Sequence, residues 1–298
     1  MSSIAFAGLG AMGRPMAANL IKAGHQLRGF DLNPAALAWL ESQGGQSCPS
    51  ASEAAAGADA LVLMVVNADQ AEAVLFEAGA LDALSPRALV ILCATCPPAR
   101  AAAIGARVEA SQRRFIDAPV SGGVVGAEAG SLTIMAAAPQ ADYEAAEPLL
   151  KAMGSRLYHV GQKAGDGAMV KTINQLLCGV HIAAAAEALA LGERAGLDTG
   201  LLLEIFGSSA AGSWMLNNRG PRMLMDDPPV TSAVDIFVKD LGIVLDAGHS
   251  TRAPLFLAAA AHQLFLAASG MGLGKADDAL VIEAYRAMAP KAAGTPRG

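Results

Sequence analysis

The first half of the chain alternates short apolar runs with longer, alanine-rich stretches. The apolar runs are typical of buried strands, and the stretches between them have helical periodicity. The expected strands are Ile4–Ala7, Leu27–Phe30, Ala60–Val66, Leu89–Leu92, Arg114–Ile116, Leu132–Ala136 and Arg156–Val160. This alternation predicts βαβ units around a parallel sheet that ends near residue 160.

After residue 162 the strand pattern fades. Residues 168–195 predict one helix of roughly 28 residues, apolar on nearly every face, which must be buried on most sides. Further helices are expected at Leu201–Ser208, Ala233–Ala247, Pro254–Ala268 and Asp277–Met288. We therefore predict two domains: residues 1–162 around the sheet, and residues 163–298 as an all-helical domain for substrate binding and dimerisation.

The composition of the chain is unusually apolar. Hydrophobic residues make up 53% and charged residues 16% of the 298 positions, and the mean hydropathy is +0.40. However, 66 residues are alanine, and no uninterrupted apolar run reaches the ~18 residues that a membrane span needs. No basic segment precedes the first apolar run, and Gly8, Gly10 and Gly13 interrupt it where a signal peptide needs its core. We expect a cytoplasmic protein with no membrane partner.

The net charge of −6 argues against a nucleic-acid partner, because phosphate binding needs clustered cations. The chain has four cysteines, and without a secretory signal a disulfide framework is not expected.

Residues Gly8, Leu9, Gly10, Ala11, Met12 and Gly13 form the pattern GxGxxG directly after the first strand. An amphipathic helix, Arg14–Ala23, follows. In this context the first glycine allows a tight turn, the second lets the backbone approach a pyrophosphate, and the third lets the helix pack on the strand. The pattern therefore predicts a dinucleotide-binding turn.

Asp31 ends the second strand, 23 residues after Gly8. A carboxylate at about this spacing hydrogen-bonds the adenosine ribose and repels a 2′-phosphate. The position predicts NAD rather than NADP as the cofactor.

Four segments, in order along the chain, resemble motifs of the β-hydroxyacid dehydrogenases, the family of 3-hydroxyisobutyrate dehydrogenase and tartronate semialdehyde reductase. They are Gly8–Leu20, Asp117–Gly123 with Gly130–Thr133, Gly165–Gln175, and Lys239–Gly242. The resemblance implies a Rossmann-type doubly wound parallel sheet followed by an all-α domain, and a homodimer or homotetramer. Residues 174–182, 213–219 and 232–240 resemble the L-threonate dehydrogenase branch of that family.

Lys171, Asn174, Gln175 and Cys178 share one face of the long predicted helix. A polar face on so apolar a helix favours a buried site. Near the helix N-terminus, the macrodipole and desolvation are both expected to lower the pKa of Lys171, which suits a general acid or base. The resemblance implies the same role for Lys171, with Asn174 fixing the substrate hydroxyl or the lysine and Gln175 beside it. The alternative is a surface lysine at a helix start.

Ser121, Gly122 and Gly123 follow a short strand, and their successive N–H groups could form a nest for an anion. The resemblance implies that they hold the substrate carboxylate. The alternative is an ordinary glycine-rich turn.

Several further positions are expected at the cofactor or substrate. Val65 and Val66, at the end of the third strand, are expected to contact NAD. The resemblance places Thr95 near the nicotinamide ribose, Lys239 at the cofactor and Asp240 in the active-site network. Without the resemblance, Lys239 and Asp240 would be a solvent-facing ion pair.

Thr95 lies inside a CxxC pattern, Cys93 to Cys96, which could be a redox pair or half a zinc site. No second CxxC or HxxxH completes a zinc set, so no metal is expected.

The leading hypothesis is an NAD-dependent dehydrogenase that oxidises the hydroxyl of a small hydroxy acid, with L-threonate as the preferred substrate. A 3-hydroxyisobutyrate or tartronate semialdehyde activity is the alternative within the family. A non-catalytic NAD sensor is the alternative of another class.

Overall fold

The computed structural model describes residues 2–288. The chain divides into two compact units between Thr172 and Ile173, and each unit is described by itself. The division falls inside helix α9 (Asp166–Arg194). The start of α9 is joined to the sheet of the N-terminal unit, because its backbone amides are hydrogen-bonded to the Asp117 carboxylate.

In the described residues, the N-terminal unit is built on a nine-stranded sheet in the order β3-β2-β1-β4-β5-β6-β8-β7, with β9 paired to β8. The strands are β1 (Ser3–Ala7), β2 (Gln26–Phe30), β3 (Gln46–Ser47), β4 (Ala60–Leu63), β5 (Leu89–Leu92), β6 (Arg114–Asp117), β7 (Val120–Ser121), β8 (Thr133–Ala137) and β9 (Arg156–Gly161). Strands β1 to β6 pair in parallel. Strand β8 runs antiparallel to β6 and β7.

The sheet is therefore mixed beyond β6, whereas the sequence predicted parallel strands throughout. The reason lies in the connection between β7 and β8, which contains only the short helix α7 (Gly123–Glu128). A parallel return needs a longer crossover, usually through a full-length helix. Six neighbouring strands keep the parallel, doubly wound arrangement that the sequence predicted.

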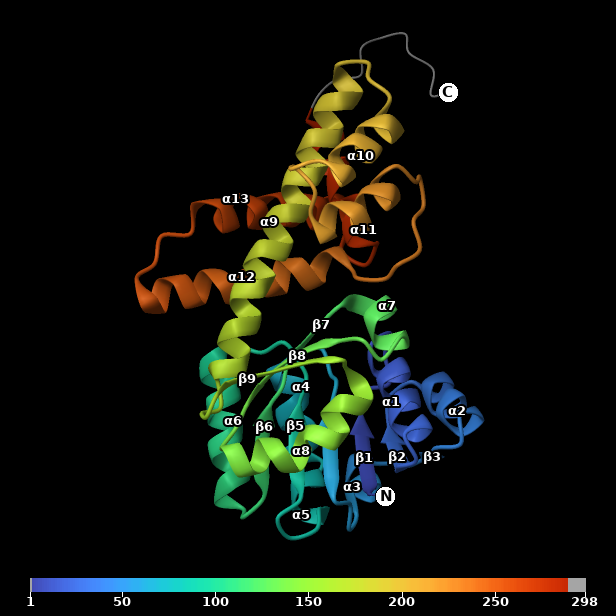
Figure 1. Ribbon diagram of the computed structural model, residues 1–298, viewed down its shortest axis with the longest axis vertical. Coiled ribbons are helices and arrows are strands. Elements are labelled where there is room, and N and C mark those ends of the chain that lie inside the picture. Colours follow the sequence, from blue (N-terminus) through green and yellow to red (C-terminus); the bar gives the residue numbers. More distant parts are fainter. Residues whose placement is uncertain (1, 289–298) are drawn as a thin grey trace. The chain divides into compact units, whose positions relative to one another are not determined.

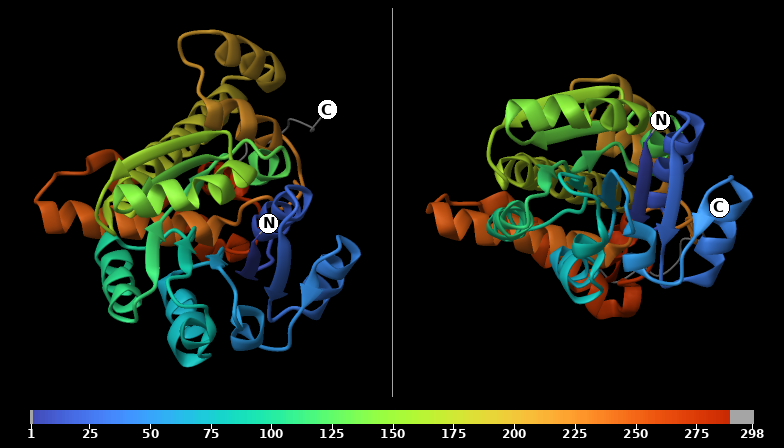
Figure 2. Two further views of the ribbon diagram at one scale, coloured as in Figure 1. Left: turned by 60° about the horizontal axis from the view of Figure 1, so that its bottom comes forward. Right: turned by 90° about the horizontal axis from the view of Figure 1, so that it is seen from below.

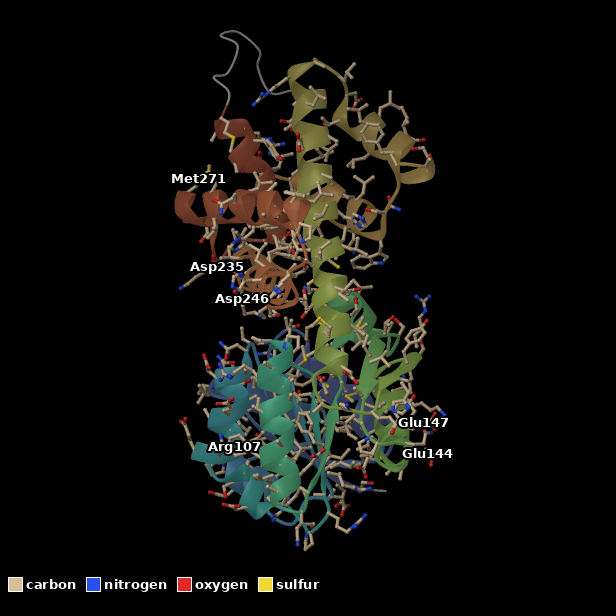
Figure 3. All side chains as sticks on the ribbon, turned by 90° about the vertical axis from the view of Figure 1, so that its left-hand side faces the viewer. Arg107, Glu144, Glu147, Asp235, Asp246 and Met271 are labelled. Atoms are coloured by element: carbon tan, nitrogen blue, oxygen red, sulfur yellow. The ribbon has the colours of Figure 1, made fainter. Side chains whose placement is uncertain are left out.

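Helices cover both faces of this sheet (Figure 1 and Figure 2). Because successive strand residues point to opposite faces, Ile4 and Phe6 pack with one set of helices while Ala5 and Ala7 pack with the other. The first set is α1 (Gly13–Lys22), α2 (Pro34–Ser42) and α8 (Gln140–Met153). The second set is α3 (Ala51–Ala55), α4 (Ala68–Glu72), η1 (Ala73–Glu77), α5 (Ala80–Ala83) and α6 (Pro98–Ala110). In Figure 3, Arg107 on α6 and Glu144 on α8 mark the outer sides of the two helix layers.

The C-terminal unit is helical around the buried part of α9. Its core joins Ile182 and Leu189 of α9 to Phe237, Leu241 and Phe265. The other helices are α10 (Thr199–Ser208), α11 (Trp214–Met223), α12 (Val234–Thr251), α13 (Phe256–Ala268), η2 (Ser269–Leu273), η3 (Asp278–Val281) and α14 (Ile282–Ala287).

Helix α11 was not expected from the sequence, because it is polar and contains Pro221. The Ser213 hydroxyl caps it by accepting a hydrogen bond from the Leu216 amide at 3.0 Å. Two of its arginines, Arg219 and Arg222, pair with the buried Asp278 and Asp277. These ion pairs hold α11 together with the packing of its Leu216 and Met223 in the core.

Two helical segments in the described residues are long and apolar enough to cross a membrane by length and composition alone, α9 and Phe256–Leu273. Within their most apolar windows, 56% and 28% of the residues are buried, respectively. Phe256 and Leu257 are 82% and 69% exposed. The C-terminal unit therefore has a core helix in α9 and an apolar surface on α13.

Candidate active site

The turn after β1 shows why two of its three glycines are required. Gly8 has φ +94°, and a Cβ there would overlap the Met64 carbonyl oxygen. A Cβ on Gly13 would overlap the Gly8 carbonyl, because α1 begins so close to the strand. A Cβ on Gly10 would have no protein atom within 4 Å, so only a ligand would need that space. This is the geometry expected of a turn that cradles a pyrophosphate at a helix N-terminus.

Asp31 lies beside this turn, at the end of β2. One carboxylate oxygen accepts a hydrogen bond from the Leu9 amide at 2.6 Å, and the other accepts from the Asn33 amide at 2.7 Å. Both bonds fix the carboxylate next to the cofactor turn, where it can meet a ribose diol.

The other predicted cofactor residues follow neighbouring parallel strands. The order β2-β1-β4-β5 places Val65 and Val66, after β4, and Thr95, after β5, at the same carboxyl edge as the glycine turn. The strand order reverses between β1 and β4, which is where open α/β sheets bind their ligands. Val66 is half-exposed there.

The CxxC thiols within this edge are not a reactive pair. Cys93 and Cys96 are not joined by a disulfide and are almost completely buried. Burial raises the pKa of the Cys93 thiol to about 12, so the thiol stays protonated and is a poor nucleophile or metal ligand. Among residues 2–288, no group of three His, Cys, Asp or Glu side chains could hold a metal ion.

The predicted anion loop follows β6 at the same edge. Gly122 and Gly123 have φ +133° and +63°, a conformation that favours glycine at both positions. Ser121 pairs with Thr133 in the short antiparallel ladder. The Asn19 side chain of α1 donates to the Ala127 carbonyl of α7 at 2.7 Å, so the helix after the cofactor turn is tied to the helix after the anion loop. The sequence reasoning had missed this role of Asn19.

Lys171 lies one turn into α9 and is 7% exposed. The start of α9 is fixed by Asp117, whose Oδ2 accepts hydrogen bonds from the Gly165 amide at 2.8 Å and the Ala168 amide at 2.9 Å. Desolvation raises the pKa of Asp117 to about 6, although these amide hydrogen bonds oppose the rise. The sequence reasoning had missed Asp117 as well; an acid that ends an apolar strand was the available signal.

The remaining predicted residues form a hydrogen-bonded chain within the C-terminal unit. Gln175 Nε2 donates to Asp240 Oδ2 at 2.5 Å, and Lys239 Nζ pairs with Asp240 Oδ1 at 2.6 Å. Asn174 Nδ2 donates to Gln175 Oε1 at 3.0 Å and also lies 3.3 Å from Cys178 Sγ. Asp240 is 2% exposed, so it is the buried anchor of this chain rather than half of a solvent-facing ion pair.

The structure thus groups the predicted residues in two sets. The N-terminal unit holds the cofactor turn, Asp31, the anion loop and Lys171, and the C-terminal unit holds Asn174, Gln175, Lys239 and Asp240. Lys171 and Asn174 lie on one helix, three residues apart. The individual roles of these residues stay predictions.

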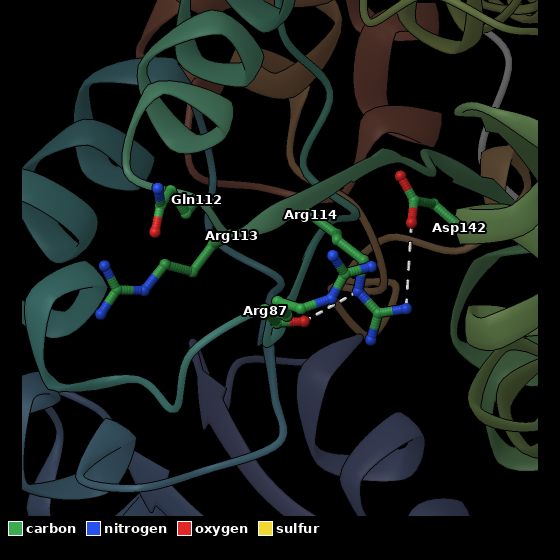
Figure 4. Close-up of a pocket in the computed structure, with 5 residues that line it drawn as sticks. All are labelled: Arg87, Gln112, Arg113, Arg114 and Asp142. Atoms are coloured by element: carbon green, nitrogen blue, oxygen red, sulfur yellow. Dashed lines mark hydrogen bonds and ion pairs between the residues drawn. The ribbon is translucent and has the colours of Figure 1, made fainter.

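A separate hollow of about 510 Å³ is lined by Arg87, Gln112, Arg113, Arg114 and Asp142 (Figure 4). It lies where β5 and β6 begin, at the amino edge of the sheet. The Arg113 guanidinium donates to the carbonyl oxygens of Ser111, Asp82 and Leu84, so it mainly ties loops together. The hollow is not part of the candidate active site.

Family comparisons cover nearly all of the described chain. Residues 3–161 match the family model described as the NAD binding domain of 6-phosphogluconate dehydrogenase. Residues 165–285 match the model described as the NAD-binding domain of NADP-dependent 3-hydroxyisobutyrate dehydrogenase.

Individual relatives are similar over their full lengths. The L-threonate dehydrogenase of Cupriavidus necator is 47% identical over 95% of this chain and 96% of its own, and that of Escherichia coli is 41% identical over 95% and 94%. A crystal structure of a 3-hydroxyisobutyrate dehydrogenase from Salmonella typhimurium has a TM-score of 0.90 and 42% identity over 94% of this chain and 98% of its own.

Proposed function

The chain belongs to the β-hydroxyacid dehydrogenase family and is an NAD-dependent oxidoreductase. From this we propose that it oxidises L-threonate at C2 to 2-oxo-tetronate. The observation that carries the choice of substrate is its similarity to five L-threonate dehydrogenases, which are 40% to 47% identical to it over about 95% of the chain.

NAD, when bound, supplies the acceptor for the hydride that leaves the substrate carbon. The Gly10 peptide, with no protein atom in the space of a Cβ, and the fixed Asp31 carboxylate fit such a cofactor. In our proposal these residues hold the pyrophosphate and the ribose, while Val65, Val66 and Thr95 line the same edge. Lys239, held by Asp240, is proposed as a further cofactor contact.

The chain's own chemistry is the transfer of one proton. We propose that the neutral amine of Lys171 takes the proton of the substrate hydroxyl as the carbon loses its hydride, and returns it in the reverse direction. The amides of Ser121, Gly122 and Gly123 hold the substrate carboxylate. Asn174 orients the hydroxyl, and Gln175 and Asp240 hold Asn174 in place through their hydrogen bonds.

A second candidate substrate is 3-hydroxyisobutyrate, because two similar solved structures carry that enzyme name. One is the Salmonella typhimurium protein, and the other, from Mycobacterium tuberculosis, is 32% identical with a TM-score of 0.82 over 96% of this chain and 99% of its own. Tartronate semialdehyde reduction belongs to the same group of candidates.

A substrate panel separates these proposals. The purified protein is mixed with NAD or NADP and with L-threonate, 3-hydroxyisobutyrate, D-glycerate or L-serine, and the absorbance of the reduced nicotinamide is followed. We expect the highest kcat/KM with L-threonate and NAD. Faster turnover of 3-hydroxyisobutyrate would support the second candidate, and NAD binding without any turnover would support a non-catalytic sensor.

We further propose that the protein acts in the cytoplasm as a homodimer or homotetramer. All four cysteines are buried and no disulfide joins them, as is usual in a reducing compartment. Large apolar side chains of the C-terminal unit are exposed, among them Leu191, Leu201, Phe256 and Leu257. A second copy of the chain would remove this surface from water.

A further inference from the structure

Asp117 is a buried carboxylate to which the proposed reaction assigns no role. It is the last residue of β6 and is 1% exposed. Along the chain it precedes the anion loop by four residues, and through space it is hydrogen-bonded to the start of the helix that carries Lys171. Asp117 is thus connected both to the anion loop and to the helix that carries Lys171, the two parts of the N-terminal unit that are proposed to bind the substrate.

The first turn of α9 has little freedom around this carboxylate. Gly165 has φ +100°, and a Cβ there would lie 2.9 Å from the Pro98 carbonyl oxygen. A Cβ on Gly167 would lie 2.6 Å from the carbonyl oxygens of both Asp117 and Met135. Glycine at both positions lets the helix start come close enough for its amides to reach Asp117 Oδ2.

The arrangement is costly for stability. Asp117 Oδ1 is buried without a hydrogen-bond partner in the described residues, and a buried charged oxygen without a partner destabilises the folded state. Among the groups near the carboxylate, Asp166 is a like charge and the Cys93 thiol is protonated, whereas the backbone amides of Gly165, Gly167 and Ala168 favour the charged form but do not outweigh desolvation.

We propose that Asp117 is a positioning residue, whose hydrogen bonds to the first turn of α9 hold Lys171 in register with the anion loop Ser121–Gly123. This inference rests on the proposed function, because it gives Lys171 and the loop a common substrate. Removing the carboxylate frees the amides of Gly165 and Ala168, so the first turn of α9 frays and Lys171 is displaced. Displacement of a proton-transfer group by about 1 Å is enough to lower a rate about a hundredfold.

The test compares Asp117→Ala with Asp117→Asn. The asparagine carbonyl oxygen can still accept from both amides, whereas alanine cannot. With the substrate that the wild type turns over best, we expect Asp117→Ala to lower kcat about a hundredfold, with the Kd for NAD unchanged within about twofold. The kcat of Asp117→Asn should be at least tenfold higher than that of Asp117→Ala. A kcat of Asp117→Ala within twofold of wild type would overturn the proposal.

Amide hydrogen exchange provides a second measurement that needs no turnover. In Asp117→Ala, hydrogen exchange at the backbone amides of Gly165 to Ala168 should become at least tenfold faster. The rate at which an acylating reagent modifies the Lys171 amine should change as well. In Asp117→Asn both rates should return toward those of the wild type. If the wild type turns over no acid in the panel, the proposed function fails, while these two rates still decide whether Asp117 positions Lys171. Unchanged rates in the alanine variant would contradict the positioning role.

Asp198 offers a matched control. Its carboxylate also accepts from two amides at a helix start, those of Gly200 at 2.8 Å and Leu201 at 3.2 Å. Asp198→Ala should speed amide exchange at the start of α10 and leave kcat within twofold of wild type. A hundredfold loss of kcat in this control as well would mean that any loosened helix start lowers the rate, and would overturn the specific role of Asp117.

Discussion

The proposed chemistry depends on single ionisable side chains, and Lys171 is the one to which we assign the proton transfer. It is 7% exposed, one turn inside a helix whose first turn is anchored to the sheet. The proposed reaction needs this amine in its neutral form, which is the form that accepts a proton.

Lys171→Ala should therefore lower kcat by about 10² to 10⁴, the usual contribution of a general base. NAD affinity, measured by fluorescence titration, should stay near that of the wild type. Lys163→Ala is the matched control, because Lys163 is exposed and precedes the same helix. A Lys171→Ala enzyme with wild-type kcat would rule out the proton-transfer role.

At the residue scale we also predict that Asp31 selects NAD over NADP. Its carboxylate is held by two backbone amides, so it cannot swing away from a 2′-phosphate. Asp31→Ala should lower the NAD over NADP preference in kcat/KM at least about tenfold, which corresponds to about 1.4 kcal/mol.

Asp59→Ala is the control for the cofactor measurement. Asp59 also accepts a backbone amide, from Ser3 at 2.9 Å, but at the amino edge of the sheet. The Asp59→Ala enzyme should prefer NAD over NADP to the same extent as the wild type. An unchanged preference in Asp31→Ala would show that other residues select NAD.

Asp117 makes stability depend on pH. Because burial raises its pKa from 3.8 to about 6, the folded state binds this proton more tightly than the unfolded state does. Its contribution to the free energy of unfolding is therefore greatest below pH 4 and falls as the pH rises to about 6, by about 3 kcal/mol in total.

Asp117→Asn removes this titration. In urea unfolding, its stability relative to the wild type should increase between pH 4 and pH 6.5 and then stay constant. Parallel stability curves for the two proteins would contradict the raised pKa.

At the scale of elements, α11 depends on buried ion pairs. Arg219 binds Asp278 through two hydrogen bonds, at 3.0 and 2.9 Å, and Asp278 is completely buried. Asp278→Ala would leave the Arg219 guanidinium buried without its carboxylate, at a cost of about 3 to 5 kcal/mol.

Urea unfolding followed by the fluorescence of Trp214, in α11, measures this loss. The matched control is Glu147→Ala, which breaks an exposed pair with Lys151 at 3.2 Å and should change stability by less than about 1 kcal/mol. Equal effects of the two substitutions would show that burial of the Arg219 pair is unimportant.

The elements also show where sequence patterns are sufficient. Strands β1, β5 and β9 and helix α9 begin or end within two residues of their predicted bounds, because apolar periodicity and buried length are local properties of the chain. Helix α11 was missed, because Asp277 and Asp278, which hold its arginines, are more than fifty residues away in sequence. The predicted domain boundary at residue 162 stays a prediction.

At the scale of the whole molecule, the apolar surface of the C-terminal unit predicts self-association. Light scattering after size-exclusion chromatography should give a molar mass of about 60 kDa or more, which is at least twice the 30.1 kDa of one chain. Replacing Phe256 and Leu257, which are 82% and 69% exposed, with serine should lower that mass. A wild-type mass of one chain would refute the homo-oligomer.

The sequence by itself determined the Rossmann-type sheet, NAD as the cofactor, and the family, because each depends on residue types at fixed local spacings. Only the tertiary structure revealed the antiparallel β8, the ties made by Asn19 and Asp117, and the chain of hydrogen bonds from Lys239 to Asn174. Such contacts join residues that are tens of positions apart, and no local periodicity encodes which side chains meet. The apolar composition, which alone could have indicated a membrane protein, is explained by two sheet faces and one helix core filled with small side chains.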